Sequence, residues 1–138
     1  MNPIKILIGI LIVLRLNSCS PNLTCSDFKE GTFYIPADTE VNIKYTLIRT
    51  QNAQVEYADG LEGSTPKYIQ LEWIDDCTYR AKYDPLKMEL DEHETFINEN
   101  NGIVIQKITI VEKCMEYIAT LSLPNGEKIT QNGKICKE

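Results

Sequence analysis

The chain predicts an all-β domain, an antiparallel meander of about eight short strands that closes into a barrel or folds into a sandwich. Two observations predict this class. Apolar and polar residues alternate with a period of two in several segments, which is typical of strands with one buried face. Residues that favour turns separate these segments at spacings of about 8 to 12 residues. About 120 residues remain once a leader is removed, which suits one domain with a modest core.

The first strands are expected before residue 58. Residues 32–35 are apolar and lie between a glycine and a proline, and residues 41–47 alternate between apolar and polar side chains. The turn at 50–52 returns the chain antiparallel through 54–57. Residues 58–67 contain two glycines and a proline, which indicates a long loop.

The most distinct hairpin lies in the middle of the chain. Residues 69–73 and 77–83 alternate on either side of a turn at Asp75 and Asp76, and Pro85 ends the second strand. The acid-rich segment 86–97 permits a strand, a short helix or a lid, and we expect strand or irregular structure.

Three more strands are expected in the last part of the chain, at 103–112, 115–123 and 128–131. Asn98 to Gly102 supplies the turn before the first of them, because Asn and Gly tolerate positive φ angles. A hairpin turn at 124–127 joins the other two. A tail is expected from Asn132 and Gly133 onward.

The N-terminus has the pattern of a bacterial lipoprotein signal. Lys5 precedes an apolar run at 6–14, and Leu16-Asn17-Ser18-Cys19 follows it, so we expect cleavage before Cys19 and lipid on its sulfur. The domain organisation is then a signal peptide at 1–18, a lipidated tether at 19–24 and one β domain at 25–138. The alternatives are an ordinary signal peptide that leaves Cys19 free or paired, and an uncleaved anchor.

The net negative charge of the chain disfavours binding to anionic partners. The chain has 20 acids against 14 bases, and loss of Lys5 and Arg15 with the leader leaves 14 − 2 = 12 bases and a net charge of about −8. Such a chain is not expected to bind nucleic acid or anionic lipid headgroups, because proteins bind phosphates mainly through clustered Lys and Arg side chains. We therefore expect membrane attachment only through the lipid on Cys19, in the cell envelope on the periplasmic side of the outer membrane, with an envelope protein or a small ligand as partner.

Four cysteines remain besides Cys19, and in an exported chain they predict two disulfides. Sequence leaves three pairings open. We favour Cys25 with Cys77 and Cys114 with Cys136, since each pair ties a segment near a terminus to a predicted strand. Metal binding is the competing interpretation, but no CxxC occurs and the spacings lack the close ligand pairs of structural zinc sites, so we expect no metal.

The sequence contains no recognisable arrangement of catalytic residues, so we expect neither enzyme activity nor a cofactor. His93 is the sole histidine and stands among acids, where a solvated surface residue is the commonest outcome. A metal held by His93 and neighbouring carboxylates is the alternative, but adjacent strand residues point to opposite faces. No serine sits in a nucleophile-elbow pattern. Asp75 and Asp76 are consecutive turn residues, which suits capping of amides better than a glycosidase carboxylate pair.

Several segments resemble one family. Residues 25–33 (CSDFKEGTF), 48–56 and 71–79 (LEWIDDCTY) are similar to small uncharacterised lipoproteins of Bacteroidetes-type bacteria. The resemblance implies a secreted β domain without an established activity. Some members carry a topoisomerase IV label, which a short, acidic, exported chain does not support.

Aromatic residues supply the candidate ligand-lining positions, namely Trp73, Tyr79, Tyr83 and Tyr117. In a lipocalin-like barrel such rings can line a pocket, although for Trp73 and Tyr79 core packing is the commoner role. We expect a structural or interaction protein of the envelope. The alternative is a lipocalin-like binding module for a small apolar or sugar ligand, with a cavity of roughly a few hundred Å³ at the barrel mouth, beneath the loop at 58–67.

Overall fold

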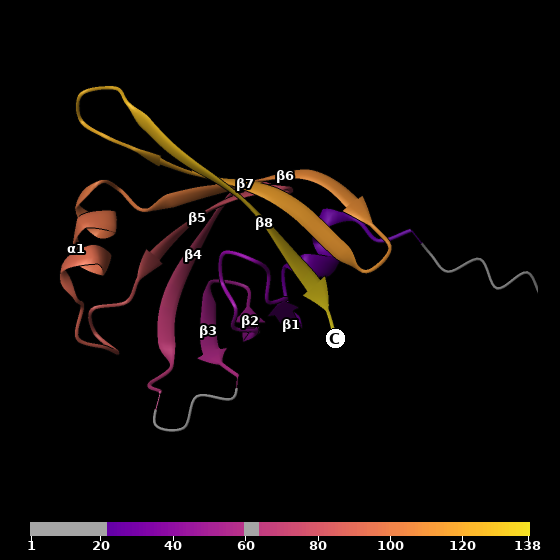
Figure 1. Ribbon diagram of the computed structural model, residues 1–138. Helices are drawn as coiled ribbons and strands as arrows, with labels where there is room; N and C mark the ends of the chain where they lie inside the picture. Colours follow the sequence, from indigo (N-terminus) through magenta and orange to yellow (C-terminus); the bar gives the residue numbers. More distant parts are fainter. Residues whose placement is uncertain (1–21, 60–63) are drawn as a thin grey trace, which may run out of the picture.

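Eight antiparallel strands form a closed, lipocalin-like barrel in which each strand pairs with the next along the chain (Figure 1). The computed structural model describes residues 22–59 and 64–138. The barrel closes where β1 (Gly31–Ile35) pairs with β8 (Lys128–Lys137). The predicted all-β meander is confirmed, as a barrel.

The remaining strands are β2 (Tyr45–Thr50), β3 (Ala53–Ala58), β4 (Lys67–Asp75), β5 (Thr78–Tyr83), β6 (Ile103–Val111) and β7 (Cys114–Ser122). A 3-10 helix, η1 (Cys25–Phe28), precedes the barrel, and an α-helix, α1 (Glu92–Glu99), connects β5 to β6. The short turns after β2, β4 and β6 lie at the same end of the barrel as η1, which we call the closed end. The opposite end, where α1 lies, is called the open end.

The main core fills the closed end. Phe28 and Phe33 are fully buried, and their rings stack with centroids 5.7 Å apart. Leu47, Met115 and Ile135 complete this cluster from β2, β7 and β8. Because η1 carries Phe28 into the barrel, the N-terminal segment seals this end before the first strand begins.

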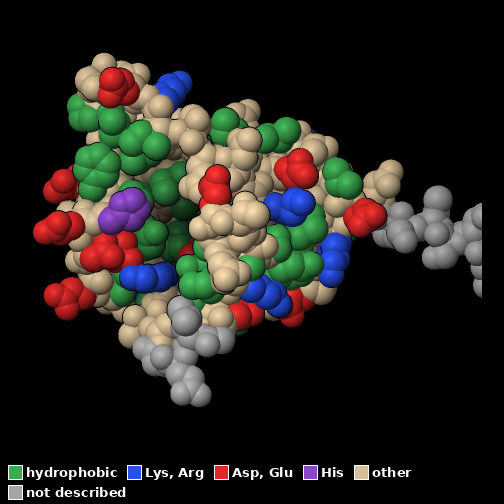
Figure 2. Space-filling model, in the orientation of Figure 1, with side chains coloured by type: hydrophobic (Ala, Val, Ile, Leu, Met, Phe, Trp, Pro, Cys, Tyr) green, Lys and Arg blue, Asp and Glu red, His purple; other side chains and the backbone are tan. Residues whose placement is uncertain are grey.

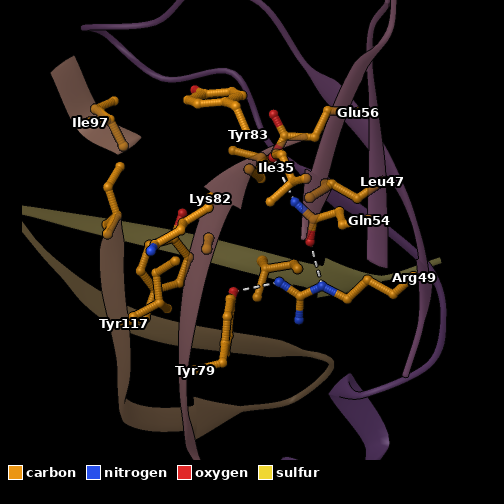
Figure 3. A pocket seen from close by; sticks show the side chains of 15 residues that line it. Ile35, Leu47, Arg49, Gln54, Glu56, Tyr79, Lys82, Tyr83, Ile97 and Tyr117 are labelled. Atoms are coloured by element: carbon orange, nitrogen blue, oxygen red, sulfur yellow. Dashed lines mark hydrogen bonds between the residues drawn. The ribbon is translucent and has the colours of Figure 1, made fainter. Parts of the chain in front are cut away.

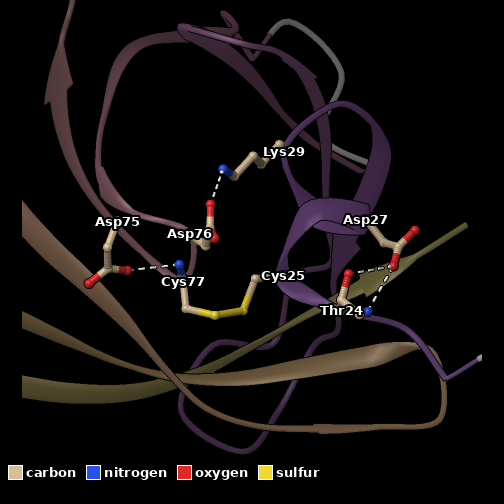
Figure 4. Close-up of a disulfide and its surroundings, with 7 residues drawn as sticks. All are labelled: Thr24, Cys25, Asp27, Lys29, Asp75, Asp76 and Cys77. Carbon is tan, nitrogen blue, oxygen red and sulfur yellow. Dashed lines mark hydrogen bonds and ion pairs between the residues drawn. A yellow bond between two sulfur atoms is a disulfide. The ribbon is translucent and has the colours of Figure 1, made fainter.

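Two disulfides reinforce the closed end. Cys25 of η1 is bonded to Cys77, which lies in the β4–β5 turn, with the Cα atoms 5.2 Å apart (Figure 4). Cys114 and Cys136 are opposite each other on β7 and β8, and they form the second bond. The favoured pairing is therefore confirmed. Lys29 and Asp76 add an ion pair of 3.1 Å between η1 and the same turn (Figure 4).

The segment 86–97 was expected to be strand or irregular, and that prediction is wrong for its second half. Residues 92–97 of this segment belong to α1. The Asp91 carboxylate accepts a hydrogen bond of 2.8 Å from the amide of Glu94, and the Glu94 carboxylate accepts one from the amide of Asp91. This reciprocal capping box stabilises the first turn of a helix.

Two strand boundaries also differ from expectation. The predicted tail at Asn132 and Gly133 belongs to β8, whose pairing with β7 is continuous from Cys114–Cys136 to Ser122–Lys128. In the predicted strand 41–47, the part before Tyr45 lies outside β2. There the Asp38 carboxylate accepts from the amide of Val41, which forms a local turn in place of a ladder.

The signal peptide at 1–18 and Cys19 lie outside the described residues, as does the tip of the loop at 58–67. Within residues 22–59 and 64–138, no helix has the length and apolar character needed to cross a bilayer.

Candidate functional site

The barrel interior contains a cavity of about 100 Å³ between the main core and α1 (Figure 3). Its walls are mostly aliphatic side chains from several elements, among them Ile35, Ile69, Ala81, Ile97 and Ile105. The strand residues among them face inward because alternate positions of a strand point to the same side, and Ile97 reaches the wall from α1. The cavity is therefore a direct consequence of period-two alternation around a closed barrel.

The floor of the cavity is polar. Arg49 is 4% exposed, and its Nη1 donates to the carbonyl oxygen of Phe28 at 2.9 Å. Its Nε donates to the side-chain oxygen of Gln54, and its Nη2 donates to the hydroxyl of Tyr79. The guanidinium also lies 4.6 Å from the centroid of the Tyr79 ring. Arg49 thus joins η1, β2, β3 and β5 beneath the cavity, where a buried charge needs such partners.

A carboxylate continues this polar floor toward the open end. The Gln54 amide nitrogen donates to one oxygen of Glu56 at 2.6 Å, and the other oxygen points away from Gln54, toward the side of the cavity where Tyr83 lies (Figure 3). Desolvation raises the pKa of Glu56, and the hydrogen bond from Gln54 and the positive charge of Arg49 oppose that shift. Glu56 is therefore the acidic group that the interior offers to a ligand.

Three of the four aromatic residues singled out in the sequence line the cavity: Tyr79, Tyr83 and Tyr117. Burial raises the pKa of Tyr83 to about 12, and burial also raises that of Tyr117. Both phenols are therefore neutral at physiological pH. Whether they contact a ligand stays a prediction.

Trp73 is not part of the cavity wall. Its ring packs beside Tyr79, with centroids 4.8 Å apart, and its indole nitrogen donates to the carbonyl oxygen of Gln51 at 2.9 Å. The ammonium group of Lys29 lies 5.0 Å from the Trp73 centroid. Trp73 is near the closed end of β4, four positions beyond Ile69, the residue of this strand that borders the cavity, and there it supports η1 and the β2–β3 turn.

An open groove of about 690 Å³ adjoins the cavity. Ile35, Glu56 and Tyr117 line both spaces, so the two adjoin at these residues. The groove exists because β1 pairs with β8 only at Phe33–Lys137 and Tyr34–Cys136, which leaves the earlier part of β8 facing the connection after β1. The face shown in Figure 2 is hollowed, and hydrophobic side chains line the hollow.

Helix α1 lies across part of the open end and is held from two sides. Glu94 is 3% exposed and forms an ion pair with Lys67 at the start of β4. Asn98 accepts from the amide of Tyr83 at 2.9 Å and donates to its carbonyl oxygen at 2.8 Å, so its side chain continues the hydrogen bonding of β5. Ile97, 3% exposed, projects from α1 into the cavity wall.

The residues considered for catalysis or metal binding do not come together. His93 is exposed on α1. Asp75 accepts from the amide of Cys77 at 2.8 Å, a turn-capping contact, and Asp76 binds Lys29 (Figure 4). Within the part of the chain that the structure describes, no group of three or more His, Cys, Asp or Glu residues is placed to hold a metal ion.

Comparison of the chain with protein-family models, curated proteins and solved structures finds no match. The geometry of the interior is therefore the basis for a functional proposal.

The polar floor was not predicted from the sequence, although a signal for it exists. With Gln51 and Asn52 as a two-residue turn, the β2–β3 register pairs Arg49 with Gln54 and Leu47 with Glu56. Since Leu47 is an expected core residue, the alternation of side chains places all four residues on the inner face.

Proposed function

We propose that this protein is a binding module whose barrel takes a small ligand with an apolar body through the open end. The observation that carries the proposal is that a cavity with mostly apolar walls adjoins an open groove at Ile35, Glu56 and Tyr117. Ligand sites typically combine apolar walls with a few convergent polar groups, and here Arg49, Gln54 and Glu56 supply them.

The size of the enclosed space limits the ligand. The cavity of about 100 Å³ is smaller than the few hundred Å³ expected for a carrier of large apolar molecules. An apolar cavity of about 150 Å³ in another protein holds benzene. The cavity here is smaller than that, so a short alkyl chain, or a ring that extends partly into the groove, is the largest group that it accepts, and the rest of the ligand occupies the groove.

The proposal includes lipid attachment at Cys19 and a periplasmic position at the outer membrane. It rests on the signal pattern in the sequence. Leu23 packs against the closed-end core, and Thr24 leads into η1. Only a few residues separate this point from Cys19, so a lipid there would hold the closed end toward the membrane and leave the open end facing away from it.

The intact mass of the protein purified from membranes tests the anchor. A chain that starts at Cys19 and carries acyl groups supports the attachment. A mass without lipid, or with residues 1–18 retained, contradicts it.

Titration with benzyl alcohol, followed by amide NMR shifts, tests the binding function. We expect saturable shifts at residues around the cavity, including Ala81, Ile105 and Tyr117. Ala81→Phe fills the cavity and should abolish them, whereas Ile48→Phe enlarges a side chain that is 46% exposed and should not. Absence of saturable shifts in the wild type, or their survival in folded Ala81→Phe, contradicts the proposal.

A protein partner is the second candidate function, and one exposed residue favours it. Leu86 precedes α1 and is 91% exposed, the largest exposure among the large apolar side chains of the described residues that are exposed, so it is available to contact a partner. A photoreactive residue at position 86 should cross-link to one envelope protein in living cells, while the same residue at position 48 should not. Equal labelling from both positions would remove the argument for a partner at Leu86.

A further inference from the structure

The cavity is lined by two positive groups, Arg49 and Lys82, and by one negative group, Glu56. Lys82 lies on β5 between Ala81 and Tyr83, whereas Arg49 lies in the floor and already donates its hydrogen bonds to the protein. Arg49 donates to the carbonyl oxygen of Phe28, to Gln54 and to Tyr79. It lies beneath the cavity and is 4% exposed. Because its hydrogen bonds hold the floor together, Arg49 is poorly placed to receive an anionic ligand.

Glu56, by contrast, has one carboxylate oxygen that is available to accept a hydrogen bond from a ligand. One carboxylate oxygen accepts from Gln54, and no described residue donates a hydrogen bond to the other. Lys67 is opposite Glu56 on the neighbouring strand, but its ammonium group pairs with Glu94 on α1. Glu56 also lies where the cavity meets the groove, so a ligand that enters from the groove reaches its free oxygen.

The surroundings of Glu56 favour a positive donor. The rings of Tyr83 and Tyr117 line the same cavity, and the faces of aromatic rings attract cations. Burial also raises the pKa of Glu56, which indicates a carboxylate that lacks sufficient compensation for lost water. A cationic donor supplies that compensation through a charge-assisted hydrogen bond.

We propose, on the basis of the binding function above, that the ligand is a small organic amine whose ammonium group binds the free oxygen of Glu56 while its apolar body lies in the cavity. Tyr83 and Tyr117 flank the ammonium group. The amine enters from the groove, with its charged end near the junction of the two spaces.

Three probes with one ring and different charges test this inference: benzylamine, benzyl alcohol and benzoate. Each is titrated at pH 7 into the wild type and into Glu56→Gln, with amide NMR shifts as the readout. Gln at position 56 retains the oxygen that accepts from Gln54 and removes the charge. Glu127→Gln, in the exposed β7–β8 turn, is the matched control, because it removes one acidic charge outside the barrel.

We expect benzylamine to bind the wild type more tightly than benzyl alcohol does, and benzoate to bind more weakly than either. Loss of a hydrogen bond to a charged group corresponds to a decrease of about tenfold or more, so Glu56→Gln should weaken benzylamine by this factor. The variant should leave benzyl alcohol unchanged, and Glu127→Gln should leave all three unchanged.

The two proposals fail in different ways. If benzyl alcohol binds while benzylamine gains no advantage, or if Glu56→Gln leaves benzylamine affinity unchanged, the amine assignment is wrong and the binding function stands. If none of the three probes binds, the binding function itself is wrong.

Discussion

The phenol ring of Tyr117 lies over Gly133, the residue opposite it on β8. A β-carbon at position 133 would overlap the Cζ and Oη atoms of Tyr117. The absence of a side chain on one strand thus makes room for an aromatic ring from the next, which is a known way to compensate a glycine in a sheet. This contact positions the ring where the cavity meets the groove.

Gly133→Ala should displace Tyr117 and lower the free energy of unfolding by about 1–3 kcal/mol, because the new methyl group overpacks the inner face. The measurement is urea unfolding of the two single variants Gly133→Ala and Tyr117→Ala and of the double variant. In the Tyr117→Ala background the glycine substitution should cost much less, since the ring is gone. Additive costs would show that the two residues are not coupled.

Asp91→Ala should loosen α1 without unfolding the barrel. Loss of the N-cap hydrogen bond to Glu94 costs about 1 kcal/mol, which corresponds to roughly fivefold faster amide exchange in α1. Hydrogen exchange followed by NMR measures this, with the amides of β7 as the internal reference. Asp91→Asn keeps an acceptor at the cap and should exchange like the wild type; if it instead matches Asp91→Ala, the cap is not the cause.

The two disulfides should differ in their contribution to stability. Cys25–Cys77 closes a separation of 52 residues and Cys114–Cys136 one of 22. Loop-closure entropy predicts losses of about 4 and about 3 kcal/mol when each pair is replaced by serine. Loss of the first bond also releases η1, which carries Phe28 into the core. Urea unfolding of the two paired variants tests the order, and a larger loss without Cys114–Cys136 would contradict it.

Glu56→Gln should stabilise the free protein at neutral pH. Burial raises the folded-state pKa of Glu56 above the ordinary value of 4.5, with Arg49 and Lys67 opposing the shift. The stabilising contribution of the protonated group is therefore complete below the ordinary value and is lost as pH rises through the raised pKa. Of the other groups near the open end, Glu94 is paired with Lys67, and Tyr83, with a pKa of about 12, stays neutral.

Thermal unfolding of the wild type, Glu56→Gln and Glu127→Gln between pH 4 and pH 8 measures this effect. The wild type should lose stability relative to Glu56→Gln as pH rises, whereas Glu127→Gln should follow the wild type. A constant difference between wild type and Glu56→Gln across this range would contradict a raised pKa.

Much of the barrel could be predicted from local patterns. The alternation in 69–73 and 77–83 predicts the β4–β5 hairpin, because burial of one face requires a period of two. Helix α1 was missed even though Asp91 and Glu94 have the spacing of a capping box. That spacing did not distinguish a helix from a loop, because the segment is rich in acidic residues and these are common both at helix N-termini and in loops.

The candidate site was only partly predictable. Tyr79, Tyr83 and Tyr117 stood out as aromatic residues on strands, but nothing in the local pattern separates them from Trp73, which lies outside the cavity wall. That distinction depends on depth along the barrel axis, which only the pairing of all strands determines.

The sequence by itself determined the class of fold, the strands of the central hairpin and a favoured disulfide pairing, because alternation and cysteine spacing act along the chain. Only the tertiary structure decided that Arg49, Gln54 and Glu56 share one interior with Tyr83 and Tyr117. These residues come from four different strands, and closure of the barrel brings them together. The cavity itself is the space that remains when inward side chains from distant parts of the chain meet, and no local pattern encodes that space.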